Sequence, residues 1–379
     1  MFDDFVSFVQ DMYETSEFIP LHAPKFNGNE KKYVLEAIDS TFVSSVGNFV
    51  DEFEKKMAEY TGVKYAVAMV NGTSALHISL LLSGVQKNTE VITQSLTFVA
   101  TCNAIKYCGA NPVFIDVNKE TLGLSPDSLK LFLEEFCENR EDGYCWNKLT
   151  NKKISACLPM HTFGFPVQLN EIKKICDLHN IELVEDMAES LGSFYNGEHT
   201  GGIGKLSALS FNGNKVITSG GGGMILTNDE ALAIRAKHLS TTSKIEHQWF
   251  FNHDEIAYNY RMPNLNAALG FAQLEALPGK LKSKRSIAKK YQTWGSDNGL
   301  KFMSEPINTK SNYWLNCAIT ENQEQRDLML KITNKNKVMT RPSWTPMHQL
   351  KMNSNYYKDQ MINTDWLYER LVNVPSSPL

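Results

Sequence analysis

One lysine in the sequence, Lys215, has neighbours suited to Schiff-base chemistry. It ends the segment Ser210-Phe211-Asn212-Gly213-Asn214-Lys215 and is followed closely by the glycine run Gly220 to Gly223. A Schiff-base lysine must approach a flat aldehyde and lose its charge, and glycines let backbone pass where side chains would collide. The pattern therefore favours a lysine that carries a cofactor. A glycine-rich turn between two short strands would give similar letters, so the interpretation depends on its context.

An acid, Asp186, directly follows the apolar segment Ile181 to Glu185, which is typical of a buried strand. A carboxylate paired with the ring nitrogen of pyridoxal phosphate keeps that nitrogen protonated, as the cofactor requires to act as an electron sink. Asp186 is therefore a candidate partner for such a ring. The alternative is that Asp186 caps a helix beginning at Met187, because Asp is among the best capping residues.

Two further segments could contact a cofactor. Asn71-Gly72-Thr73-Ser74 follows the predicted strand Tyr65 to Val70 and opens a helix, which places backbone N–H groups and two hydroxyls where a phosphate can bind. Ordinary helix capping explains the same residues equally well. Phe98 lies near the end of the next strand and could stack on a cofactor ring, although a single aromatic residue more often belongs to a core.

The elements around these residues alternate between strands and helices from about residue 63 to 227, which predicts a mostly parallel sheet covered on both faces. In such a sheet, ligands bind at the carboxyl ends of the strands. Two shorter strands, 208–211 and 224–227, should flank the lysine and glycine segment. Long helices are expected at 265–277 and 287–294, and a smaller α+β unit from about residue 312. We predict a large domain of residues 1–250 with an N-terminal arm and a smaller C-terminal domain of residues 251–379.

Composition narrows the functional classes. The chain has 379 residues, 42% of them hydrophobic, and a net charge of −4, which gives no general electrostatic footprint for nucleic acid. The acidic N-terminus is unlike a secretory signal and no apolar run is long enough to cross a bilayer, so we expect a cytoplasmic protein without a membrane partner. Seven scattered cysteines and nine histidines without metal-ligand spacing predict neither a disulfide framework nor a metal site. We interpret the basic stretch from Lys280 to Lys290 as a solvated helix face.

Other cofactor and catalytic patterns are not supported. The first strand leads into Asn71-Gly72-Thr73 and not into Gly-x-Gly-x-x-Gly, and the glycine run enters a strand and not a helix, which disfavours a nicotinamide dehydrogenase. The sequence contains neither Gly-x-Ser-x-Gly nor a Walker A pattern for a hydrolase or a phosphoryl transferase.

Taken together, the segments resemble the pyridoxal-phosphate-dependent sugar aminotransferases of the DegT/DnrJ/StrS type over nearly the whole chain. In chain order, the matching segments are Ile19-Pro20-Leu21, Phe53-Glu54, Asn71 to Leu76, Thr97 to Thr101, Glu185 to Glu189, Ser210 to Lys215, Tyr258 to Met262, and Thr340 to Trp344 with His348.

The resemblance implies an aspartate-aminotransferase-like (fold type I) α/β architecture, with a mostly parallel seven-stranded sheet between helices and a smaller α+β C-terminal domain. It implies pyridoxal 5'-phosphate as the cofactor and Lys215 as its Schiff-base lysine. Asp186 would be the ring-nitrogen partner. By the same resemblance, the phosphate and ring contacts are Gly72, Thr73, Ser74, Phe98, Glu189 and Ser210, with Asn259 reaching the phosphate of a neighbouring subunit. A homodimer with active sites at its interface is implied as well.

Two positions depart from the family pattern. Glu189 stands where many members have Gln or His beside the phenolic oxygen of the cofactor, and a carboxylate there would be repelled unless it is protonated or turned away. Lys205 is a second lysine near the site, at a place where an acid is common. We favour Lys215 as the Schiff base because Ser210 and the glycine run surround it, whereas Lys205 is expected to be solvent-exposed.

The expected reaction moves an amino group from an amino acid, by family analogy L-glutamate, to the keto group of a nucleotide-linked deoxysugar used for bacterial surface glycans. Within the family, the segments around Lys215 and Phe98 look most like the aminotransferases of legionaminic-acid and bacillosamine-type pathways. This likeness suggests a UDP-linked 4-keto-6-deoxy-N-acetylhexosamine, with a dTDP-linked, GDP-linked or free keto sugar as the alternative. A sugar dehydratase of the same family is disfavoured because its cofactor lysine is replaced by histidine. An intact Lys215 with Asp186 also disfavours a non-catalytic cofactor-binding regulator.

Overall fold

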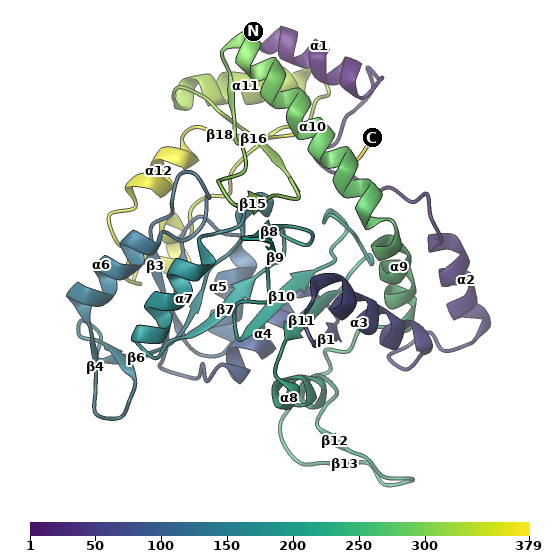
Figure 1. Cartoon of the computed structure of the whole chain (residues 1–379), viewed down its shortest axis with the longest axis vertical. Helices are drawn as coiled ribbons and strands as arrows, with labels where there is room; N and C mark the ends of the chain where they lie inside the picture. The colour runs from purple at the N-terminus through teal and green to yellow at the C-terminus, as the bar shows by residue number, and fades with distance from the viewer.

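A nine-stranded sheet forms the centre of the larger part of the computed structural model, which describes residues 1–379 (Figure 1). Seven strands follow one path in the order β1-β11-β10-β7-β6-β2-β3, and β10, β7, β6, β2 and β3 are parallel to one another. β11 is antiparallel to both β1 and β10. The path consists of β1 (Tyr65–Met69), β11 (Gly223–Thr227), β10 (Leu206–Ser210), β7 (Glu182–Asp186), β6 (Lys152–Leu158), β2 (Glu90–Gln94) and β3 (Asn111–Ile115). The predicted mostly parallel seven-stranded sheet is therefore confirmed. A hairpin of β4 (Cys137–Asn139) and β5 (Cys145–Asn147) extends it beside β6.

Helices cover both faces of this sheet. On one face, α4 (Gly72–Leu82) and α8 (Glu230–Ser240) bury apolar side chains against β1, β10 and β11, and α5 (Val99–Tyr107) packs against α4 and β3. On the other face lie α3 (Asn48–Thr61), α6 (Pro126–Phe136) and α7 (Leu169–Leu178). Local sequence explains several helix starts: Asn71, Ser125 and Asp229 each accept a hydrogen bond from a backbone N–H in the first turn of the helix that follows. These starts place helix N-termini at the carboxyl ends of strands.

A smaller unit packs beside the large sheet. Its four-stranded antiparallel sheet has the order β14 (Lys301–Phe302), β16 (Asn316–Ile319), β18 (Leu371–Val374), β17 (Arg341–Pro342). The apolar face of α1 (Phe2–Met12) joins the core of this unit together with α10 (Leu277–Asn298) and α11 (Gln323–Lys335). The N-terminal helix, which we grouped with the large domain, thus packs on the small sheet. The division at residue 250 stays a prediction.

The remaining elements are α2 (Glu30–Asp39), α9 (Asn264–Glu275), α12 (Ile362–Tyr368), β8 (Phe194–Tyr195), β9 (Glu198–His199), β15 (Thr309–Lys310), η1 (Thr162–Gly164), η2 (Met347–Gln349) and η3 (Lys351–Asn353).

The interpretation of residues 280–290 as a solvated helix face is wrong for two of its lysines. α10 begins ten residues earlier than expected, with proline in its first turn, and its inner face buries Lys280 and Lys284. Lys284 Nζ donates to the carbonyl oxygens of Trp314, at 3.1 Å, and Ser376, at 2.6 Å. Lys280 Nζ donates to the carbonyl of Lys25 and to the side-chain oxygen of Gln273. Backbone carbonyls thus satisfy amines that a charge pattern alone would place in water.

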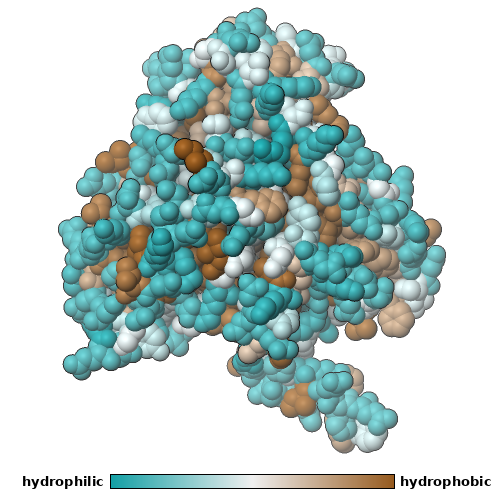
Figure 2. Space-filling view, viewed as in Figure 1, coloured by the Kyte–Doolittle hydropathy of each residue, from teal (hydrophilic) through white to brown (hydrophobic).

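A long hairpin, β12 (Lys244–Ile245) and β13 (Asn252–His253), projects from the body beyond α8 (Figure 1). In the space-filling view it forms a separate lobe with apolar residues among polar ones (Figure 2). Trp249, Phe250 and Phe251 at its tip are exposed, the last to 76% of its surface.

None of the helices is both long enough and apolar enough to span a bilayer. All seven cysteines are buried and unpaired.

Candidate active site

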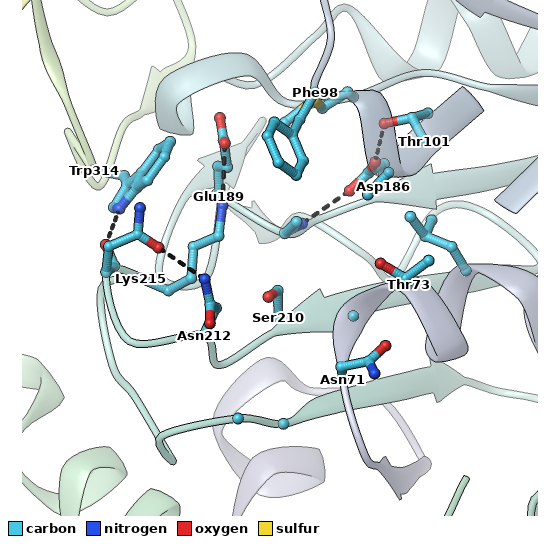
Figure 3. A pocket seen from close by; sticks show the side chains of 18 of the residues that line it. Asn71, Thr73, Phe98, Thr101, Asp186, Glu189, Ser210, Asn212, Lys215 and Trp314 are labelled. Carbon is cyan, nitrogen blue, oxygen red and sulfur yellow. Dashed lines mark hydrogen bonds and ion pairs between the residues drawn. The ribbon is translucent and has the colours of Figure 1, made fainter. Parts of the chain in front are cut away.

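Lys215 lies in the loop between β10 and β11, where its side chain enters a cavity of about 310 Å³ at the carboxyl ends of the parallel strands (Figure 3). The loop closes on itself through a hydrogen bond from the Lys215 N–H to the carbonyl of Asn212. Lys215 Nζ is 3.1 Å from Glu189 Oε1 and 4.0 Å from the centre of the Trp314 ring. An ammonium over an aromatic face is held by the ring quadrupole. The amine is therefore positioned from two sides inside the cavity.

Asp186 is the last residue of β7 and also lines this cavity. β7 and β10 are parallel neighbours, with Asp186 paired opposite Ala208. Asp186 and the loop that carries Lys215 therefore lie at the same edge of the sheet. Its two carboxylate oxygens accept hydrogen bonds from the Thr101 hydroxyl at 2.8 Å and from the Ala188 N–H at 3.1 Å. Burial raises the pKa of Asp186, and these hydrogen bonds oppose that rise. No helix begins here, so the helix-cap interpretation of Asp186 is wrong.

Glu189 lines the cavity and points toward Lys215 (Figure 3). Its side chain is fully buried, and it accepts a hydrogen bond from the Phe163 N–H at 2.8 Å as well as pairing with Lys215. Burial raises the pKa of Glu189 to about 7, although Lys215 and the Phe163 N–H act to lower it. The carboxyl group can therefore carry a proton near neutral pH. A protonated carboxyl group is not repelled by the phenolic oxygen of the cofactor, so an acid can be tolerated at this position.

The segment after β1 caps a helix and also borders the cavity. Asn71 caps α4 by accepting a hydrogen bond from the Ser74 N–H at 2.8 Å, and Thr73 faces the cavity. A Cβ atom on Gly72 would lie 2.7 Å from the Ser210 Cβ, so glycine allows the helix end to approach β10. Ser210 lines the cavity as well, whereas Ser74 is buried and is not among the lining residues. The helix N-terminus and two hydroxyls thus meet at one end of the cavity.

Phe98 is not a core residue. Its side chain is 46% exposed, lines the cavity, and lies 5.9 Å from the Trp344 ring, measured between ring centres. Between Thr73 and Ser210 at one end and Lys215 and Glu189 at the other, it offers an aromatic face to a planar ligand (Figure 3). The glycine run borders the same space through Gly221 and Gly222.

The remaining predicted residues lie elsewhere. Lys205 is partly exposed, pairs with Glu182 at 2.6 Å, and does not line the cavity. It is therefore not placed to serve as the Schiff base. Asn259 is exposed at the base of the projecting hairpin and accepts a hydrogen bond from Arg261. Its expected contact with a neighbouring subunit stays a prediction.

Sequence reasoning missed the individual roles of Thr101 and Trp314. Thr101 follows Phe98 by one helical turn, and this spacing could have suggested that both residues face one site. Trp314 contacts Lys215 and donates its indole N–H to the carbonyl of Asn214 at 2.7 Å. It comes from a segment a hundred positions further along the chain, and no local pattern marks it.

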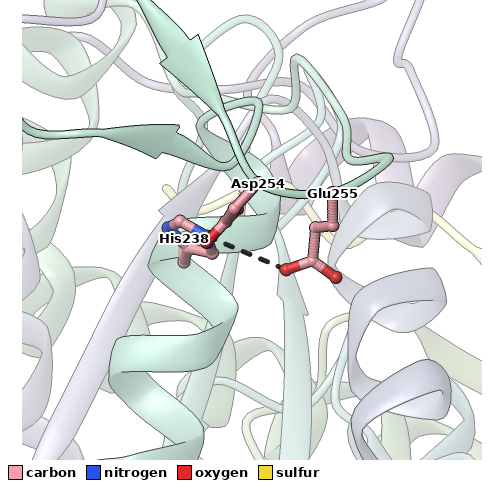
Figure 4. A group of neighbouring side chains, drawn as sticks. All are labelled: His238, Asp254 and Glu255. Atoms are coloured by element: carbon pink, nitrogen blue, oxygen red, sulfur yellow. Dashed lines mark hydrogen bonds and ion pairs between the residues drawn. The ribbon is translucent and has the colours of Figure 1, made fainter.

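A separate group of side chains lies at the base of the hairpin (Figure 4). His238 Nε2 is 2.8 Å from Asp254 Oδ1 and 3.7 Å from Glu255 Oε1, a grouping that could hold a metal ion. Arg235, however, already binds both carboxylate oxygens of Glu255. The cluster therefore acts as an ion-pair network that fastens the hairpin to α8.

The cavity suits pyridoxal phosphate by its donor set. It combines an amine for the aldehyde, a buried carboxylate for the ring nitrogen, an aromatic face, and a helix N-terminus with hydroxyls for the phosphate. A mostly parallel sheet carries these groups at one edge. Together they define the class of enzymes that hold pyridoxal phosphate on a lysine side chain.

Comparison with known proteins agrees with that class. A model of the DegT/DnrJ/EryC1/StrS aminotransferase family matches residues 24–379. The chain is 37% identical to GDP-perosamine synthase of Escherichia coli O157:H7 over 362 residues, which cover 96% of this chain and 94% of that protein. It is 35% identical to GDP-perosamine synthase of Vibrio cholerae over 363 residues, 95% and 94% of the two chains. The crystal structure of the aminotransferase TlmJ from Streptoalloteichus hindustanus superposes with a TM-score of 0.85 and 26% identity, covering 95% and 93%.

The chain therefore belongs to the DegT/DnrJ/EryC1/StrS aminotransferase family. It is a pyridoxal-phosphate-dependent sugar aminotransferase with the fold of that family, as the resemblance predicted.

Proposed function

We propose that this enzyme transfers an amino group from an amino acid, L-glutamate by analogy, to the keto group of a nucleotide-linked keto-deoxysugar. The observation that carries the proposal is the position of Lys215 Nζ, 3.1 Å from the buried Glu189 carboxylate in a cavity that Asp186 also lines. An amine in such a place can bind an aldehyde and can then act as an acid or base toward a substrate carbon.

The side chains divide the work. Pyridoxal phosphate, when bound, supplies an electron sink for the charge that develops on the substrate carbon. Lys215 removes the proton from the α-carbon of the donor and later delivers a proton to the sugar carbon. Asp186 would pair with the ring nitrogen of the cofactor and keep it protonated, and Thr101 keeps the Asp186 carboxylate oriented. Glu189 neutralises the Lys215 ammonium and, with its pKa raised by burial to about 7, can store a proton close to the amine.

Two nucleotides are candidates for the carrier of the sugar. The expected UDP-linked sugar rests on the resemblance to legionaminic-acid and bacillosamine-type enzymes and stays a prediction. A GDP-linked sugar is the second candidate, and it is favoured by two relatives, 37% and 35% identical, that are named GDP-perosamine synthase. Loops that contact the substrate vary independently of the cofactor site, so both nucleotides require testing.

We also propose that the enzyme acts as a homodimer. The projecting hairpin exposes Trp249, Phe250 and Phe251, and large apolar side chains gathered on a projection indicate an interaction surface. Asn259 lies at the base of the same hairpin, where it pairs with Thr241. The family resemblance implies that this residue reaches the phosphate of the neighbouring subunit, so we assign the hairpin to the contact between subunits. Analytical ultracentrifugation of a Trp249→Ser, Phe251→Ser variant should show a monomer. A dimer of unchanged stability would contradict this use of the hairpin.

A panel of nucleotide ketosugars tests the proposed function. The purified enzyme is first exposed to L-glutamate alone, which should change its visible absorbance, because an amino group then stays on the enzyme. After the glutamate is removed, UDP-, GDP- and dTDP-linked 4-keto-6-deoxyhexoses are added one at a time, and the aminated sugar is detected by mass spectrometry. The productive sugar also restores the starting absorbance. If no amino donor changes the absorbance, the aminotransferase proposal is refuted.

A further inference from the structure

A second cavity adjoins the one that contains Lys215. It has a volume of about 440 Å³ and shares Asn214, Trp314 and Trp344 with its neighbour. Its other walls come from the N-terminal segment around His22 and from the end of β17 around Arg341. No acidic side chain is among its lining residues. A cavity that shares a wall with the cofactor cavity and is lined by no carboxylate is suited to an anionic part of a substrate.

Two polar side chains in this cavity have no partner in the protein. Both ring nitrogens of His22 are buried without a hydrogen bond, and so is the hydroxyl of Ser343. The Asn214 carbonyl lies near enough to His22 to raise the pKa of its ring, and this carbonyl also accepts the hydrogen bond from the Trp314 indole N–H. Buried polar groups are normally paired, so an unpaired group that faces a cavity marks a place where a ligand or water supplies the partner.

The fold holds His22 firmly in this position. The segment before it pairs with the small unit through a parallel bridge between Ile19 and Val338. On either side of His22, the Leu21 carbonyl accepts a hydrogen bond from the Ser376 N–H, and the Ala23 N–H donates to the Ser377 hydroxyl. The backbone around His22 is thus fixed while its ring is left without partners. That combination fits a binding residue better than a mobile arm.

The electrostatic surroundings favour an anion. Burial, together with the charges of Lys284, Lys280 and Lys215, holds the pKa of His22 well below its ordinary value. The ring is therefore neutral and can donate one N–H. Arg341 lines the cavity, is exposed at its rim, and forms no hydrogen bond or ion pair with another side chain. A free guanidinium with two neutral donors forms a suitable set for a carboxylate or a phosphoryl group.

We propose that Arg341, Ser343 and His22 bind an oxyanion, a carboxylate or a phosphoryl group, of a substrate whose reacting carbon lies at Lys215. The proposal rests on the proposed function, since it assigns the cavity to a substrate of that reaction. Two sources share this chemistry: a carboxylate of the amino donor, and the diphosphate of the nucleotide sugar. In either case, binding of the oxyanion would fix how far the reacting carbon of the substrate lies from Lys215 Nζ.

Calorimetric titration of the cofactor-saturated enzyme tests the proposal with two simple probes. Glutarate has the carboxylates of the donor without its amine, and inorganic pyrophosphate has the charge of the diphosphate. We expect one of them to bind, and we expect Arg341→Gln, Ser343→Ala and His22→Phe each to weaken that binding about tenfold or more, as for a lost hydrogen bond to a charged group. Binding of glutarate alone assigns the cavity to the donor, and binding of pyrophosphate alone assigns it to the nucleotide.

Two control variants separate this cavity from other effects. Lys290→Gln removes one positive charge from an exposed position on α10 and should leave anion binding unchanged. Thr73→Val alters the cofactor cavity and should not affect the probes when the cofactor is bound. Because His22 and Ser343 form no internal hydrogen bonds, their replacement should not lower the melting temperature. A lower melting temperature with unchanged anion binding would assign them a structural role and overturn the proposal.

The outcomes also distinguish this proposal from the proposed function. Borohydride reduction followed by peptide mass spectrometry reports whether the cofactor is attached at Lys215. If it is not attached, the proposed function fails, yet the titrations still decide the cavity because they require no reaction. If it is attached and neither anion binds, or if both bind equally well to the Ser343→Ala and His22→Phe variants, the oxyanion site is refuted and the aminotransferase is not.

Discussion

The two adjoining cavities differ in how completely their buried polar groups are paired. In the cofactor cavity, Asp186 accepts two hydrogen bonds and Glu189 contacts both Lys215 and the Phe163 N–H. In the second cavity, His22 and Ser343 are buried without any partner. Groups that must keep a defined charge during a reaction are oriented in advance by the protein. Groups that recognise a substrate retain free donors until the substrate arrives. The difference suggests that chemistry and recognition are carried by separate walls around Lys215.

The largest expected effect comes from removing the amine that both cavities share. Lys215→Ala should lower the rate of amino transfer by at least about 10³-fold, because it removes the covalent attachment and the acid–base group together. The cofactor should still bind non-covalently through the Asp186 and Thr73 ends of the cavity. Rate and cofactor content are measured on the same preparation. Lys205→Ala is the matched control and should be near wild type, since Lys205 lies outside the cavity. Normal turnover by Lys215→Ala would disprove its role.

The next effect tests whether the charge of Asp186 matters beyond its shape. Asp186→Asn can keep the hydrogen bond from the Ala188 N–H through its one carbonyl oxygen, and its amide N–H can donate to the Thr101 hydroxyl, so the geometry of the cavity should be preserved. We expect kcat to fall by about 10²- to 10³-fold, the range found when an oriented electrostatic partner is removed. Stopped-flow measurement of the first half-reaction with L-glutamate is the appropriate assay. A loss of less than about tenfold would mean that the carboxylate does not partner the ring.

Local patterns were sufficient to predict the parts of the molecule that depend on neighbours in sequence. Alternating apolar segments predicted the parallel sheet, and the positions of Asp186 and Lys215 just after strands predicted that they would meet. Packing between distant segments was not predictable in this way. Trp314 reaches Lys215 from the small unit, and Lys284 is buried because carbonyls of Trp314 and Ser376 surround its amine. Both depend on tertiary contacts that no short window of sequence contains.

Glu189 allows the electrostatics of the cofactor cavity to be tested without a reaction. Its pKa in the folded protein is about 7, above the ordinary glutamate value. A raised pKa means that the folded state binds the proton more tightly, so this contribution to stability is complete below about pH 4.5 and is lost as the pH rises through 7. Relative to Glu189→Gln, the wild-type protein without cofactor should lose of the order of 3 kcal/mol between pH 4.5 and 8.

Thermal melting of both proteins across that pH range provides the measurement. Glu182→Gln is the matched control, because it also removes the carboxylate from a glutamate–lysine pair, but at a partly exposed position. Its difference from wild type should change little with pH, since solvent screens such pairs. Parallel melting curves for wild type and Glu189→Gln would show that the buried carboxylate does not take up a proton in this range.

The smallest expected effect concerns the hydroxyl of Thr101, which lines the cofactor cavity and binds Asp186. Thr101→Val removes the hydrogen bond to Asp186 Oδ2 while keeping the volume of the side chain, so the half-reaction with L-glutamate should slow about tenfold. The lost hydrogen bond opposed the effect of burial, and the pKa of Asp186 should therefore rise further. The acid limb of the rate profile should move to higher pH as a result. Thr101→Ser keeps the hydroxyl and should keep the wild-type profile. If the serine and valine variants behave alike, Thr101 fills space and does not tune the carboxylate.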